Sequence, residues 1–279
     1  MRFFENKQLD LITVEDVEKF KDWRRRQKKQ APNTKLKKNA KATSSAIIKP
    51  ATVNRELACL RAMINYFIRK DVLVKNPVSK VKFLTEDNEQ MRVVSVEEER
   101  LYLMACSQPL RDVATIMVET GMRPSEVFGL SWKDVNLEKR FVTIQQGKTK
   151  SARRKIPLSD RAHAVFAARR TNRDGEFVFP GMRRVDNTSH VVKLTNAHKG
   201  AVSRSKVEPF RLYDLRHTFA TRAAEAGVDL VTLAALMGHS RVQMLMRYAH
   251  PTEQHQVEAI RRIESAREVK TRKVINLAN

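Results

Sequence analysis

The sequence predicts a mainly α-helical protein with a small antiparallel β-sheet, an α+β fold in two domains. Three observations carry this prediction. Apolar residues recur with the 3.6-residue period of a helix over most of the chain. Two short runs with strand character, FVTIQQ (141–146) and RRKIPLS (153–159), are separated by a turn near Gly147 to Ser151 and predict a hairpin. Asn76-Pro77 ends the helical pattern of the first part of the chain, ahead of a linker.

The first domain is expected over residues 1–85, followed by a linker over 86–94. Thr13 is a good N-cap for a helix that runs to about Gln30, with acidic residues in its first turn. Between this helix and the next, residues 28–50 are basic and aperiodic, which fits either a solvated loop or a loop ordered on a DNA backbone. A second helix, about 52–70, places one apolar stripe: Val53, Leu57, Leu60, Ile64 and Phe67.

The second domain is expected over residues 95–279. Ser95-Val-Glu-Glu98 forms a capping box that begins its first helix. A strand-like FVF occupies 177–179, and a charged amphipathic helix over 253–268 forms the tail. The other expected helices span about 96–106, 110–120, a short segment from Pro124, 160–171, 212–226, 229–237 and 241–248.

The charge of the chain indicates a polyanionic partner. There are 54 Lys and Arg against 31 Asp and Glu, a net charge of +23. Residues 1–85 hold 21 of these basic residues against 8 acidic ones, a difference of +13. Such a field attracts phosphates without regard to sequence, so nucleic acid is the expected partner. A membrane surface is the weaker alternative, because no basic amphipathic helix with a Trp/Phe face stands out.

The remaining bulk features indicate a cytoplasmic protein. No apolar run approaches the ~20 residues that span a bilayer, and the N-terminus has no apolar signal segment. Cys59 and Cys106 are too few and too far apart for a disulfide framework, so each is expected to be a small buried hydrophobe.

Four polar positions stand at predicted helix ends. In Gly121-Met-Arg-Pro-Ser-Glu126, Pro124 can begin a helix, which puts Arg123 where backbone N–H groups and a guanidinium converge on an anion. Arg216 begins a later helix, His239 follows Gly238, and Tyr248 ends the next helix. Taken singly, each has an ordinary structural explanation, and the helix–Gly–helix spacing around Gly238 also fits a helix-turn-helix.

Taken in order, these segments resemble the tyrosine recombinase (phage integrase) family over residues about 10–260. The matching motifs are R-P-S-E, a basic hairpin, Y-D-L-R-H-T-F-A-T, L-M-G-H-S and R-Y-A-H. The resemblance implies a helical core-binding domain at the N-terminus and a tyrosine-recombinase catalytic domain at the C-terminus, which clamp DNA from two sides. The core-binding domain looks one helix short, as in a minimal or N-terminally shortened member.

The resemblance also implies a mechanism. Arg123 and Arg216 would hold the non-bridging oxygens of the scissile phosphate, and His239 would donate to one of them. Tyr248 would be the nucleophile that forms a 3′-phosphotyrosyl bond and frees a 5′-hydroxyl. This bond conserves the phosphodiester energy, so rejoining needs neither ATP nor a metal ion, and no cofactor is expected. The general acid would be a hairpin lysine, for which Lys148 is favoured over Lys150.

One position departs from the family pattern. The family usually has histidine four residues before His217, where this chain has Tyr213. Because an unperturbed tyrosine has a pKa near ~10, Tyr213 is expected to hydrogen-bond the phosphate or Tyr248 and not to act as a general base. His217 is expected to point elsewhere on its helix. Tyr66 and Tyr102 lie outside the motifs and are expected in the core.

The sequence therefore predicts a site-specific recombinase that integrates or excises a mobile element. Its expected partners are double-stranded DNA attachment sites, a homotetramer on DNA docked through the stripe Val257, Ile260 and Ile263, and accessory DNA-bending proteins. A non-catalytic DNA-binding protein of the same fold and a type IB topoisomerase are the alternatives. The DNA sequence that is recognised does not follow from one chain, since base readout depends on which side chains reach a groove.

Overall fold

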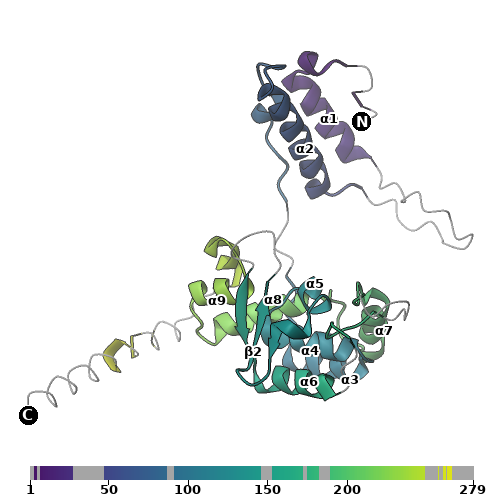
Figure 1. Cartoon of the computed structure of the whole chain (residues 1–279). Coiled ribbons are helices and arrows are strands. Elements are labelled where there is room, and N and C mark those ends of the chain that lie inside the picture. The colour runs from purple at the N-terminus through teal and green to yellow at the C-terminus, as the bar shows by residue number, and fades with distance from the viewer. Residues whose placement is uncertain are drawn as a thin grey trace, which may run out of the picture. The chain divides into compact units, whose positions relative to one another are not determined.

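The computed structural model describes residues 3–4, 7–27, 47–86, 91–145, 153–171, 175–181 and 189–248, together with 257, 260–261 and 263–265. The chain divides into two compact units, Met1–Gln90 and Met91–Asn279, which are described separately (Figure 1). Among the described residues, no helix has both the length and the apolar character that a membrane crossing requires. The predicted fold class, mainly helical with a small antiparallel sheet, is confirmed.

The described residues of the first unit form a pair of helices, α1 (Val14–Arg26) and α2 (Pro50–Ile68), and the short 3₁₀ helices η1 (Leu9–Leu11) and η2 (Pro77–Lys80). Thr13 and Asp16 form a capping box at the start of α1. The two helices and η2 bury a small apolar core of their own, to which these buried residues contribute: Val17, Phe20, Val53, Leu57, Leu60, Ile64 and Val78.

Two expectations for α2 were wrong. Tyr66 is 51% exposed, and Cys59 is also exposed. Both lie on the solvent face of the helix, outside the apolar stripe that packs against α1. Tyr102 and Cys106 of the second unit are buried as expected, and burial raises the pKa of the Cys106 thiol to about 11.

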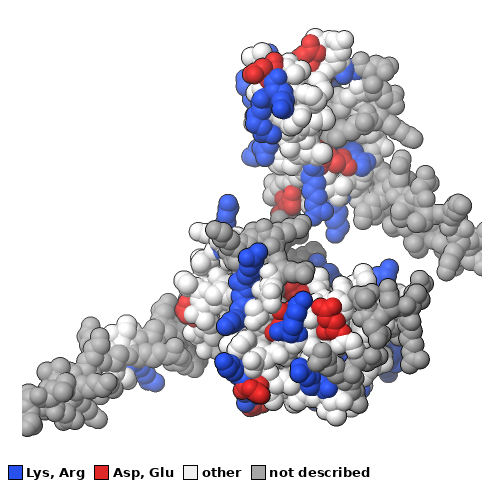
Figure 2. Space-filling model, viewed as in Figure 1, with Lys and Arg blue, Asp and Glu red and all other residues white. Residues whose placement is uncertain are grey.

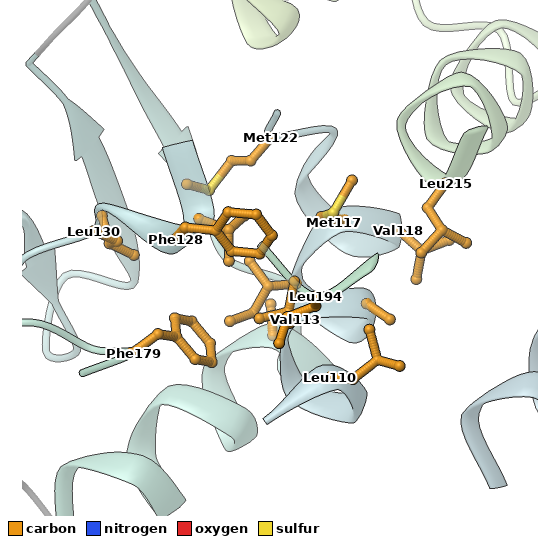
Figure 3. Packing of buried hydrophobic residues seen from close by; sticks show 14 of the residues in the cluster. Leu110, Val113, Met117, Val118, Met122, Phe128, Leu130, Phe179, Leu194 and Leu215 are labelled. Carbon is orange, nitrogen blue, oxygen red and sulfur yellow. The ribbon is translucent and has the colours of Figure 1, made fainter. Parts of the chain in front are cut away.

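The second unit is built around α4 (Leu110–Thr120), which packs against several other helices. These are α3 (Val96–Ala105), α5 (Pro124–Phe128), α6 (Asp160–Thr171) and α8 (Asp214–Glu225). Figure 3 shows the apolar side chains of α4, Val113 and Met117 among them, packed against Phe128, and Leu215 of α8 close to Val118. Because α4 is buried along most of its length, its C-terminal end at Gly121 is held in a fixed place.

A three-stranded antiparallel sheet covers part of this core. Its strands are β1 (Val135–Asn136), β2 (Phe141–Ile144) and β3 (Arg154–Pro157), in the order β1-β2-β3. Val142 pairs with Ile156, and both are buried, whereas the neighbouring pair Thr143 and Lys155 lies on the other face. The predicted hairpin is confirmed. The strand-like residues 177–179 form only an isolated bridge, between Phe177 and Ser131.

Helix α7 (Thr195–Ser205) was not predicted. Its sequence is polar and contains Gly200, so it lacks an apolar stripe. It is held against α3 by buried polar contacts: the Tyr102 hydroxyl lies 2.7 Å from His198 Nδ1, and His198 Nε2 lies 2.8 Å from the Phe210 carbonyl oxygen. These long-range contacts cannot be predicted from local sequence.

The C-terminal part of the second unit is a small helical cluster. Helix α9 (Leu230–Met237) is capped by Asp229 and ends at Gly238, and the 3₁₀ helix η5 (Val242–Tyr248) follows it. Leu233 and Met237 of α9 bury Leu245 and Tyr248 of η5 against Ala220 of α8. Helix α9 also contacts β3. The described residues of the tail are helical, and its stripe, Val257, Ile260 and Ile263, is 50–57% exposed.

Candidate active site

Arg216 lies at the centre of the candidate site. It is in the first turn of α8 and is 1% exposed. Its Nη1 donates to the carbonyl of Gly121 and its Nη2 to that of Met237, both at 2.6 Å. These carbonyls lie at the C-terminal ends of α4 and α9, where backbone acceptors lack helical partners and the dipole favours a cation. Arg216 therefore links the C-terminal ends of α4 and α9.

Burial, and next the guanidinium of Arg123, lower the pKa of Arg216 to about 10. Arg216 is therefore still protonated at neutral pH. The lowered pKa indicates that the Arg216 guanidinium is shielded from water and lies near other positive charges. Such an environment stabilises a bound anion more strongly than water does.

Arg123 is positioned by a carboxylate. As predicted, it is the N-cap of α5, with Pro124 in the first turn. Glu126 Oε2 accepts from the Arg123 backbone N–H at 2.8 Å, and Oε1 accepts from Arg123 Nη1 at 2.7 Å. The Arg123 side chain is 31% exposed, so it is the arginine of the site that a phosphate in solvent can reach.

Sequence reasoning missed Arg154, which completes this arrangement from β3. Its Nη2 and Nη1 donate to Glu126 at 2.8 and 3.1 Å, and its Nε donates to the Leu236 carbonyl at 2.7 Å. Gly238 has a φ of +66°, and a Cβ there would lie 2.8 Å from Arg154 Nη1. Glycine is thus required for both the left-handed backbone and the close approach of the guanidinium. The sequence indicated that Gly238 ends a helix, but it did not indicate that Arg154 lies against this glycine.

Burial alone would raise the pKa of the Glu126 carboxyl. Hydrogen bonds and charge from Arg154, together with the hydrogen bonds of Arg123, outweigh burial and hold this pKa below its usual value of 4.5. The carboxylate therefore adds stability above the ordinary pKa, and this stability is lost as the pH falls toward the lowered value.

We expect Glu126→Gln to lower the free energy of unfolding at pH 7 by about 3 kcal/mol, because the buried guanidinium of Arg154 loses the carboxylate charge of Glu126. Urea unfolding of the wild type and of Glu126→Gln at pH 7 and pH 4 measures this loss. The difference in the free energy of unfolding between the two proteins should be smaller at pH 4. Glu97→Gln is the matched control, since Glu97 pairs with Arg100 on the surface, and little change is expected. An equal loss at both pH values would contradict a role for the Glu126 charge.

His239 contacts Arg216 directly. Its Nε2 lies 2.8 Å from Arg216 Nη2. Burial, and then the charges of Arg216, Arg123 and Arg154, lower the pKa of His239 to about 4. The ring is therefore neutral at pH 7, with Nε2 as acceptor and the proton on Nδ1. His239 Nδ1 and Arg216 Nε are buried and have no hydrogen-bond partner among the described residues.

Tyr248, at the end of η5, is 4% exposed. Its hydroxyl lies 2.5 Å from Nδ1 of His217. The expectation that His217 points elsewhere on its helix was wrong. The Tyr213 ring, 37% exposed, packs edge-on against His217 at 5.1 Å between centroids. The sequence did carry a signal, because residues four apart on a helix share a face, so His217 lies on the same face as Tyr213.

The structure therefore brings together Arg123, Arg216, His239 and Tyr248, with His217 in contact with Tyr248 and Tyr213 stacked on His217. They come from α5, α8, the turn after α9 and the end of η5. Lys148 and Lys150 lie outside the described residues. The chemical roles of all these residues stay predictions.

The chain is similar to known proteins over much of its length. A model of the phage integrase family matches residues 71–255. The integrase of Salmonella phage P22 is 29% identical over 243 residues, covering 82% of this chain and 62% of that protein. A transposase from transposon Tn916 of Enterococcus faecalis is 26% identical over 253 residues, 78% of this chain and 62% of that protein. The chain thus spans about six tenths of the length of these relatives.

Solved structures show the same fold. The Tn1549 transposon integrase in complex with a circular intermediate DNA has a TM-score of 0.70 at 21% identity, covering 94% of this chain and 90% of that one. A lambda integrase dimer bound to a COC′ core site has a TM-score of 0.64 at 16% identity, covering 89% and 69%.

Proposed function

Since this chain belongs to the phage integrase family, we propose that it is a site-specific DNA recombinase that cleaves and rejoins DNA through a 3′-phosphotyrosyl bond to Tyr248. The observation that carries the proposal is the pairing of a buried tyrosine hydroxyl with a histidine, next to a cluster of arginines. A phosphodiester is an anion with no electrophilic carbonyl, and an enzyme attacks it by neutralising its charge and aligning a nucleophile.

In this proposal Arg123 and Arg216 have different roles in holding the scissile phosphate. Arg123, the more exposed of them, binds a non-bridging oxygen of the scissile phosphate. Arg216 supplies positive charge from the buried side of the site. Its Nε and Nδ1 of His239, which have no partner among the residues that the structure describes, are the donors that bound phosphate oxygens satisfy. Charge that builds up on the phosphoryl oxygens in the transition state is thereby stabilised by groups already in place. Lys148 donates the proton that the leaving 5′-oxygen needs.

The substrate in this proposal is a pair of double-stranded DNA attachment sites. Both relatives compared by structure were solved with DNA, which supports this class of substrate. The first unit binds DNA through its backbone phosphates, and the +13 charge of residues 1–85 supports that role. On the face seen in Figure 2, basic side chains lie on both units. The working assembly is a homotetramer, helped by accessory DNA-bending proteins, and the exposed stripe of the tail supports docking between copies.

One assay separates this function from its alternatives. The protein is incubated without metal with a supercoiled plasmid and a labelled duplex, both carrying the DNA that flanks its gene. Strand exchange between the two molecules is the expected result. Relaxation of the plasmid without exchange would instead identify a topoisomerase. A mobility shift of the duplex with neither cleavage nor relaxation would identify a binding protein and contradict the proposal.

A further inference from the structure

The contact between His217 and Tyr248 is fixed by packing. His217 lies in the first turn of α8, and Tyr248 closes η5. The Tyr248 ring is buried together with Leu245 against Ala220 and Met237, so its hydroxyl has little freedom. On its other side the His217 ring meets Tyr213, which limits its rotation. The 2.5 Å between Nδ1 and Oη is the distance of a short hydrogen bond.

The protonation states of the pair fit a transfer between them. Burial lowers the pKa of His217, and nearby charges act on it in both directions: Asp214 raises it, while Arg211, Arg247 and Arg216 lower it. His217 is therefore neutral at pH 7. Burial also raises the pKa of the Tyr248 phenol above 10.0, against the opposing effect of Arg247. A neutral tyrosine is a weak nucleophile, so it needs a base within hydrogen-bond reach when it attacks.

No other neutral base touches the Tyr248 hydroxyl among the described residues. Tyr213 contributes a ring contact to His217. His239 is engaged at Nε2 with Arg216. We assign Nδ1 of His217 as the acceptor in its contact with the Tyr248 hydroxyl, because the neutral tyrosine carries the hydroxyl proton, and this assignment puts the ring proton of His217 on Nε2.

We propose that His217 accepts the proton of Tyr248 when the tyrosine attacks DNA and returns it when the DNA is rejoined, in place of the histidine that Tyr213 replaces. The inference rests on the proposed recombinase function and assigns a further catalytic residue to it. His217 qualifies as catalytic because it touches the reacting oxygen.

The step balances without any co-reactant. The Oη–H bond breaks and an Nδ1–H bond forms on His217, which becomes a cation. The freed electron pair on Oη forms the bond to phosphorus, and the bond from phosphorus to the 5′-oxygen breaks. That oxygen takes a proton from the hairpin lysine and leaves as a hydroxyl. In rejoining, the 5′-hydroxyl gives its proton back to the hairpin lysine and attacks phosphorus, the bond from phosphorus to Oη breaks, and Nδ1 returns its proton to the tyrosine.

His217→Asn tests the proposal, because the asparagine amide can stand where Nδ1 stands and accept the hydrogen bond, but cannot take a proton. Single-turnover cleavage of a nicked duplex, in which the covalent complex accumulates, measures the effect. We expect a rate lower by about 10²- to 10⁴-fold at pH 7.5 with DNA affinity unchanged. His163→Asn is the matched control. It makes the same substitution on α6, where His163 Nε2 lies 3.1 Å from the Leu137 carbonyl oxygen, and its rate should stay within about threefold of the wild type.

The pH profile separates proton transfer from simple positioning. The wild-type rate should be flat at neutral pH and fall as acid protonates His217, whose pKa lies below 6.5. The His217→Asn rate should climb about tenfold per pH unit toward the pKa of Tyr248. A 5′-bridging sulfur leaves without needing a proton, so it should rescue Lys148→Ala and not His217→Asn.

Several outcomes would overturn the inference. These are a His217→Asn rate within a few-fold of the wild type, a wild-type pH profile in that variant, or faster cleavage, which would make the contact a restraint on Tyr248. If His217→Asn does not fold, His217→Gln is measured in the same way, and Tyr213→His in that background should restore part of the rate. Failure of the wild-type protein itself to cleave would count against the proposed function, so the two failures are distinguishable.

Discussion

A protein carrying Tyr248→Phe binds its DNA and forms no covalent complex with it. Removal of an attacking oxygen costs on the order of 10⁶ in rate in a well-studied hydrolase, and a comparable loss is expected here. Phenylalanine keeps the ring that packs with Leu245 and Met237, and only the hydrogen bond to His217 is lost. The free energy of unfolding should therefore fall by only about 1 kcal/mol. Trapping on a nicked duplex, resolved on a denaturing gel, measures the adduct.

Tyr213→Phe is the control for that experiment, because Tyr213 is the other tyrosine that lies near the site. It should trap DNA as the wild type does. If the adduct survived in Tyr248→Phe and vanished in Tyr213→Phe, the assignment of the nucleophile would be wrong.

Arg216→Lys is expected to lose both cleavage and stability, although the charge is kept. The fork of the guanidinium reaches two carbonyls and His239 at once, and a single ammonium cannot reproduce that geometry. Loss of buried charge-assisted hydrogen bonds should lower the free energy of unfolding by about 2–3 kcal/mol. Loss of a preorganised donor should lower the single-turnover cleavage rate by about 10²- to 10³-fold.

Arg222→Lys provides the matched comparison for Arg216→Lys. Arg222 lies on the same helix, donates to Glu99 at 2.5 Å and to the Val94 carbonyl at 3.0 Å, and has no contact with the site residues among its hydrogen bonds. It should lose stability and cleave at the wild-type rate. Cleavage at equal rates by both variants would show that Arg216 has a structural role only.

Local sequence signals predicted the elements that are closed by local interactions. Thr13 and Ser95 cap the helices that they were expected to cap, and Gly121 ends α4 with a φ of +65°. Helix α7 was missed because its place depends on His198 and its partners 12 and 96 residues away. Strand β1 was missed because a strand of two residues is too short to show an alternation of apolar and polar residues.

In the candidate site, too, local sequence signals were predictive and long-range contacts were not. Arg123, Arg216, His239 and Tyr248 were found by their order along the chain, and the structure brings them together. The contacts of these residues were not predictable from sequence. Arg154 looked like one more basic residue of a hairpin, and His217 like a neighbour of Arg216. Their importance depends on which elements meet at the ends of α4 and α9, and local sequence does not contain that information.

The most direct test of covalent catalysis by Tyr248 identifies the tyrosine that carries the DNA. Wild-type protein is trapped on a nicked duplex, the DNA is trimmed, and the tryptic peptides are read by mass spectrometry. Trypsin separates the two candidates, because Tyr248 falls in the peptide Tyr248–Arg261 and Tyr213 in the peptide Leu212–Arg216. We expect a 3′-phosphonucleotide on Tyr248–Arg261. The same mass added to Leu212–Arg216 would contradict it.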